Sequence, residues 1–246
     1  MFIIVGGASR SGTNNVSTFL HLHGDVMMCH TMRVIRTKTE EGLARECRIA
    51  VEDGHPCLQP YICHNNDPRR FLWRSFVEEK NSHLVEGCFT KHVGVRWDYA
   101  EWSDVNLSEA ARTGEAKFIF TMRNLKDLFM SLRYHNFLGK GSIQDNLNRF
   151  ERATTNSIKK ISGMKDFCPV SVSEGRDLKR MLDWLGLEPT GFQREWMLDP
   201  PIINSSRKEG YVEFKKETEP QIEIPIDLEK RYWEVLEVAR LAYSDS

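Results

Sequence analysis

Short apolar runs alternate along the chain with longer stretches in which apolar residues recur at helical spacing. The short runs predict β-strands and the longer stretches predict α-helices. The predicted strands are residues 2–5, 25–29, 84–89, 117–122 and 167–172. The predicted helices are a first one through Val16, Phe19 and Leu20, then residues 37–51, 68–80, 125–136, 143–161, 177–185 and 228–243. This alternation predicts one α/β domain over residues 1–246, with a parallel sheet covered by helices on both faces.

The first strand leads through a turn of small residues into the first helix, in the segment FIIVGGASRSGTNNVSTFL. Glycines let backbone N–H groups approach an anion, and a helix N-terminus adds favourable partial charge, so the segment predicts a phosphate-binding loop. Gly7, Gly12 and Thr13 have the spacing of a Walker A loop. The lysine that this motif places between the last two is missing, and the nearby cation is Arg10. An ordinary strand-to-helix turn with an exposed arginine is the alternative interpretation.

A second polar motif follows the strand at residues 117–122. Arg123, Asp127, Ser131 and His135 recur every four residues, which places them on one face of a helix. A guanidinium group and a hydroxyl at this spacing can both reach one phosphate. Because Arg10 and Arg123 each follow the carboxyl end of a strand, where ligands of parallel sheets bind, we expect them to face one crevice. A surface face with an Asp127–Arg123 ion pair is the alternative.

Together the two motifs resemble the sulfotransferase family that uses 3′-phosphoadenosine 5′-phosphosulfate (PAPS), and most nearly its bacterial and tyrosylprotein branch. In that family, G-x-x-R-S-G-T after an N-terminal strand binds the 5′-phosphosulfate, and an Arg and a Ser eight residues apart hold the 3′-phosphate. The resemblance implies a P-loop-type three-layer fold, with PAPS as donor and 3′-phosphoadenosine 5′-phosphate (PAP) as product. The residues that match the family's donor contacts are Arg10, Ser11, Gly12, Thr13, Arg123 and Ser131, together with Ser205 and Arg207 in a C-terminal loop. Asn14 replaces the second Thr of the family's loop and is expected to contact the donor as well, because it can still donate a hydrogen bond.

The resemblance also implies transfer of a sulfuryl group to a hydroxyl or similar acceptor on a small molecule, carbohydrate or peptide. Arg10 and Lys91 are expected to stabilise the transferring group. In the related branch a Glu in a Glu-Glu-Thr-Arg segment is the base. Here the segment is CHTMR, and His30 takes the place of a carboxylate as the expected base. This departure keeps two alternatives open, a catalytically inactive sulfotransferase-fold nucleotide-binding protein and a P-loop NTP-dependent kinase.

Composition narrows the expected partners. A net charge of −1 over 246 residues gives no positive field for nucleic acid. No apolar run approaches the roughly 18 residues of a membrane span, and the first strand begins at once, so we expect no membrane anchor or signal peptide.

The cysteines are expected to be reduced thiols in a cytoplasmic protein. His55, Cys57, Cys63 and His64 fit zinc spacing poorly, so no metal is expected. The sequence specifies neither the acceptor nor the oligomeric state.

Overall fold

The computed structural model describes residues 1–8, 10–29, 92–98, 116–162, 164, 167–171, 175–199 and 209–242. Its elements in chain order are β1 (Phe2–Gly7), α1 (Thr13–His21), β2 (Val26–Cys29), β3 (His92–Asp98), β4 (Lys117–Met122), α5 (Leu125–Tyr134), α6 (Ile143–Ile161), β5 (Phe167–Ser171), α7 (Gly175–Leu185), α8 (Gly191–Leu198), α9 (Glu209–Thr218), the 3-10 helix η2 (Glu219–Gln221) and α10 (Ile226–Ala242).

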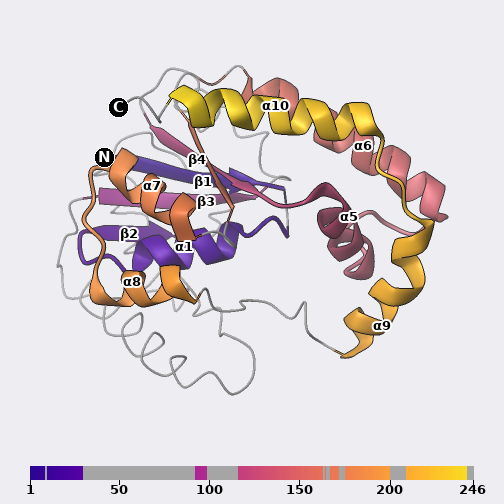
Figure 1. The fold of residues 1–246 in the computed structure, drawn as a ribbon, viewed down its shortest axis with the longest axis horizontal. Coiled ribbons are helices and arrows are strands. Elements are labelled where there is room, and N and C mark those ends of the chain that lie inside the picture. The colour runs from indigo at the N-terminus through magenta and orange to yellow at the C-terminus, as the bar shows by residue number, and fades with distance from the viewer. Residues whose placement is uncertain are drawn as a thin grey trace.

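Within these ranges, five parallel strands form one sheet in the order β2-β3-β1-β4-β5. β1 is the central strand, and its Ile4 is in register with Val95 of β3 and Phe118 of β4. Because all strands run in one direction, their carboxyl ends share one edge of the sheet, which faces α5 and α9 (Figure 1). The segments that follow β1 and β4 therefore lie next to each other.

Alternating side chains of the central strands pack on opposite faces of the sheet. On one face, Ile4, Phe118 and Phe120 form a buried cluster with residues of α5, α6 and α10. On the other face, Val5 and Ile119 are buried with residues of α1, α7 and α8. Figure 1 shows α10 on one side of the strands and α1 and α8 on the other. The expected α/β fold with a parallel sheet is confirmed, and helices cover both of its faces.

Most predicted elements in the described ranges are found close to their expected bounds. The strands at residues 25–29 and 167–172 correspond to β2 and β5, and the last four predicted helices correspond to α5, α6, α7 and α10. The predicted strand at 84–89 and the predicted helices at 37–51 and 68–80 lie outside the described residues. Four of the described elements were not predicted, namely β3, α8, α9 and η2.

β3 lies between β1 and β2, so it is an interior strand of the described sheet. Its sequence, HVGVRWD, mixes apolar residues with charged ones and contains a glycine, which weakens the strand signal. Gly94 is needed for packing, because a Cβ atom there would lie 3.1 Å from Ile3 Cβ and overlap Met28 Sδ. The strand is therefore specified by its neighbours more than by its own sequence.

Gly191 begins α8, and a Cβ atom at this position would meet no other atom within 4 Å. Glycine loses more backbone entropy on folding than alanine does, so Gly191→Ala should raise the free energy of unfolding by about 0.4–1 kcal/mol. Urea denaturation of the two proteins measures this difference. A decrease would show that the first turn of α8 requires a backbone conformation that alanine resists.

Candidate anion-binding site

The loop between β1 and α1 is a tight turn built on two glycines. Gly7 and Gly12 have φ angles of 148° and 109°, which favour glycine. Ser11 N donates to Ala8 O at 3.0 Å, and Val16 N donates to Gly12 O at 3.1 Å. Gly12 is the N-cap of α1 and has no side chain to cap the helix. The amino end of α1 therefore lacks the usual internal oxygen from its N-cap, and an external anion can serve in its place.

Ser11 and Thr121 attach this loop to β4. The Ser11 hydroxyl donates to Ala8 O at 2.6 Å and lies 2.5 Å from the Thr121 hydroxyl, and Ser11 is 1% exposed. Thr121 Oγ1 also lies 3.1 Å from Gly6 O. Both polar hydrogens of Ser11 are thus directed into the loop itself. In this conformation Ser11 supports the loop, and its predicted contact with a ligand would require these bonds to rearrange.

Arg10 is at the tip of the loop with a φ of 73°. A non-glycine residue in this left-handed region costs roughly 1–2 kcal/mol, and such strain is concentrated at functional sites. Its Nε donates to Ser131 Oγ at 3.2 Å, and one terminal nitrogen lies 2.9 Å from His135 Nε2. Arginine is only a donor, so His135 Nε2 must accept this bond and the imidazole is neutral. His135 was on the predicted helix face but was not predicted as a site residue.

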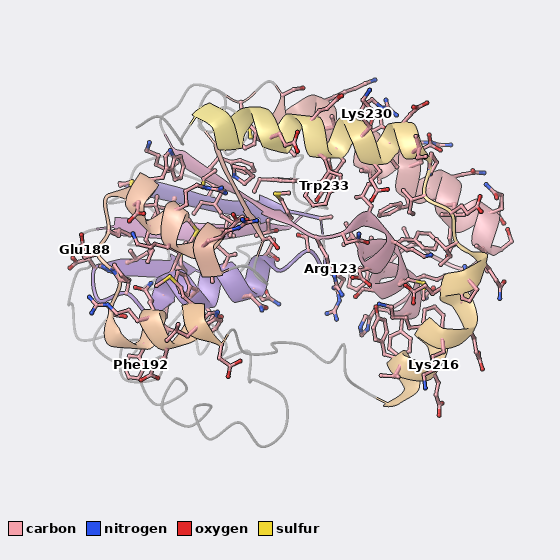
Figure 2. The ribbon with its side chains drawn as sticks, in the orientation of Figure 1. Arg123, Glu188, Phe192, Lys216, Lys230 and Trp233 are labelled. Carbon is pink, nitrogen blue, oxygen red and sulfur yellow. The ribbon has the colours of Figure 1, made fainter. Side chains whose placement is uncertain are left out.

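Arg123 leaves the end of β4 and reaches the same loop. Its NH1 atom donates to Arg10 O at 3.1 Å. Figure 2 shows Arg123 between the end of the sheet and α5. The structure therefore brings together Arg10, Arg123 and Ser131, which come from two segments more than a hundred residues apart.

The two arginines form a concentrated positive charge. Burial lowers the pKa of Arg10, and the nearby charge of Arg123 lowers it further. Asp127, the acid considered as a partner for Arg123, pairs instead with Lys215 at 2.7 Å. In the part of the chain that the structure describes, no carboxylate pairs with either guanidinium group. Two adjacent cations that no described carboxylate neutralises favour a ligand with several negative charges.

Asn14 and Thr13 lie in the first turn of α1, and both were predicted to contact the ligand. Asn14 Oδ1 is buried and has no hydrogen-bond partner among the described residues. Thr13 is 4% exposed. This oxygen is an acceptor, so a contact of Asn14 with an anion would have to come from its amide N–H groups.

A cavity of about 830 Å³ lies beside this site rather than in it. Asn124, Asp127 and Lys215 line it together with residues between 219 and 229, and neither Arg10 nor Arg123 does. Its walls carry both signs of charge, and Asp127 and Lys215 already neutralise each other. Volume alone would favour this cavity, but the positive charge that no described carboxylate neutralises lies at the arginines, where we place the candidate site.

The remaining predicted residues, His30, Lys91, Ser205 and Arg207, lie outside the described residues, as do the cysteines and histidines considered for zinc. Among the helices that the structure describes, none has the length and apolar character needed to cross a membrane.

Comparison with known proteins assigns no family to the chain. No protein-family model matches it, and a search of curated proteins gives no match.

Proposed function

We propose that this protein is a sulfotransferase that moves a sulfuryl group from PAPS to a hydroxyl or similar acceptor. The observation that carries the proposal is the contact of Arg10 with both Arg123 and Ser131 at the carboxyl edge of the sheet. An Arg and a Ser eight residues apart, joined to the arginine of a glycine-rich loop, provide donors for two separate anionic groups. PAPS carries such groups at its 3′ and 5′ positions.

The proposed binding mode assigns one end of the donor to each motif. Arg123 and Ser131 bind the 3′-phosphate, because a guanidinium group offers a planar pair of donors and the hydroxyl adds one more. Ser131 accepts a bond from Arg10 and keeps its own hydroxyl hydrogen for the phosphate. The amino end of α1, from Gly12 to Asn14, binds the 5′ end.

Arg10 has the central part in the proposed reaction. The S–O bond to the 5′-phosphate breaks as the acceptor oxygen bonds to sulfur, and the acceptor's proton passes to a base, for which His30 is the sequence-based candidate. Negative charge grows on the leaving phosphate oxygen. Arg10 leaves Ser131 and His135 and stabilises that charge, since a positioned cation in a partly buried site lowers the barrier. Positioning supplies the rest, as in phosphoryl transfer.

Calorimetric titration with PAP and with ATP tests the donor assignment. PAP should bind more tightly than ATP, because ATP lacks the 3′-phosphate that Arg123 and Ser131 are proposed to hold. Adenosine 5′-phosphate is the matched control, and its affinity should fall below that of PAP. Equal or tighter binding of ATP would contradict PAPS as the donor and favour a nucleoside triphosphate.

Catalysis needs a separate measurement. Radiolabelled PAPS is incubated with a panel of phenols, sugars and tyrosine-containing peptides, and transfer of the label is followed. We expect transfer to at least one class. If PAP binds but no label moves to any acceptor, the protein is a nucleotide-binding protein without this activity.

A further inference from the structure

Tyr211 near the start of α9 has a hydroxyl that no described residue satisfies. The residue is 4% exposed, and its hydroxyl is buried without a hydrogen-bond partner among the described residues. Buried polar groups are nearly always paired. Leaving one unpaired costs about 1–3 kcal/mol. A ligand that supplies an acceptor would recover that cost.

A continuous set of contacts joins Tyr211 to the arginines. Its ring meets that of Tyr134 edge to face, with 5.1 Å between centroids, and the ring of Tyr134 meets that of His135 at 5.0 Å. His135 Nε2 in turn lies 2.9 Å from Arg10. The aromatic group made by Tyr134, His135, Tyr211 and Phe214 therefore borders the candidate anion-binding site.

Burial keeps the Tyr211 hydroxyl protonated and therefore a hydrogen-bond donor. Burial raises the pKa of Tyr211, while the positive charges of Arg123 and Arg10 oppose that rise. The hydroxyl is therefore protonated near neutral pH and, unlike the guanidinium groups, brings no further charge. A protonated phenol next to two cations is suited to donate to an oxygen of a phosphate dianion.

We propose that Tyr211 is a further ligand contact, and that its hydroxyl donates a hydrogen bond to a phosphate oxygen of the anion held by Arg10 and Arg123. The identification of that phosphate as part of PAP rests on the function proposed above. The contact itself requires only a phosphate ester or pyrophosphate. The ligand reaches the hydroxyl as the Arg10 side chain leaves His135.

The variant Tyr211→Phe removes the hydroxyl and keeps the ring that packs on Tyr134. PAP and pyrophosphate are titrated calorimetrically into the full chain and into this variant. We expect affinity for PAP to fall about 5- to 30-fold. This is less than the full contribution of a hydrogen bond to a charged group, because a water molecule can replace part of the lost bond. Without ligand, the midpoint of thermal unfolding should stay equal or rise, because an unpaired hydroxyl is removed. Tyr134→Phe is the matched control, and its affinity for PAP should be unchanged.

The outcomes separate this inference from the proposed function. If the unmodified protein binds PAP and Tyr211→Phe binds it equally well, the inference is wrong and the proposed function stands. If the unmodified protein binds pyrophosphate but not PAP, and Tyr211→Phe weakens pyrophosphate binding, the donor assignment is wrong and the inference stands. A variant that loses thermal stability without ligand and keeps its affinity would assign the hydroxyl a structural role and overturn the inference.

Discussion

Replacing Gly7 with alanine should lower the free energy of unfolding by roughly 2–5 kcal/mol, from backbone strain and overpacking together. Gly7 has a φ of 148°, which side chains of L-residues rarely allow. A Cβ atom there would overlap Thr121 Oγ1 and lie 2.9 Å from Thr121 O and 2.7 Å from Ser11 Oγ. The oxygen of the β4 backbone cannot move aside without breaking the sheet. A typical domain has about 5–15 kcal/mol of stability, so the change would remove a large part of it.

Urea denaturation of Gly7→Ala measures this cost, and Gly186→Ala is the matched control. Gly186 has a φ of 69° at the end of α7, and a Cβ atom there would meet no atom within 4 Å. This control therefore carries only the left-handed strain, about 1–2 kcal/mol. If both variants lose the same stability, the close approach of the loop to Thr121 contributes nothing. A larger loss for Gly7→Ala would show that the loop is held tightly against β4.

The parts of the fold that could be predicted are those in which local sequence and burial agree. β4 is a nearly continuous run of apolar residues and is buried on both faces. α6 keeps helical periodicity over its whole length, and its predicted bounds match the structure. α7 ends at Leu185, as its predicted range does, and the left-handed Gly186 follows it, with Leu187 N bonded to Leu182 O at 2.9 Å. In each case the residue pattern within one segment is enough to predict the secondary structure of that segment.

The missed elements depend on contacts that are distant in sequence or on short local signals. α8 begins with a capping box, in which Thr190 and Gln193 bond each other's backbone N–H groups. This signal is readable in the sequence, but α8 is short and is stabilised by Trp196 and by a bond from Gln193 to Phe19 O. α9 packs on α5 through its aromatic residues, which pair with Tyr134. Neither contact follows from local periodicity.

The meeting of Arg10, Arg123 and Ser131 followed from topology, because segments after parallel strands share one edge of a sheet. The directions in which individual side chains point could not be predicted from topology. Ser11 has the right position in the motif, yet its hydroxyl turns inward to Thr121. Asp127 pairs with Lys215 because α9 packs against α5, a contact across 88 residues. The partners of these side chains depend on tertiary packing, which a short sequence motif does not specify.

Replacing Arg123 with alanine should weaken PAP binding roughly 10- to 150-fold, which corresponds to about 1.5–3 kcal/mol for hydrogen bonds to a charged group. Arg123 is proposed to bind the 3′-phosphate directly, and its NH1 atom also supports the strained backbone of Arg10 through a 3.1 Å bond to the Arg10 carbonyl oxygen. The substitution therefore removes a ligand contact and loosens the other cation. Calorimetry with PAP gives the loss in affinity.

Two further variants identify which property of Arg123 matters. Lys126→Ala removes a positive charge from the first turn of the same helix, and it should leave PAP affinity within about threefold, since a charge that does not contact the ligand is partly screened by salt. Arg123→Lys keeps the charge but loses the planar pair of donors, so its affinity should lie between those of Arg123→Ala and the unmodified protein.

Because adenosine 5′-phosphate has no 3′-phosphate, its affinity should respond to Arg123→Ala much less than that of PAP. An equal loss for both nucleotides would show that Arg123 acts only through the loop, and it would remove Arg123 from the 3′-phosphate site.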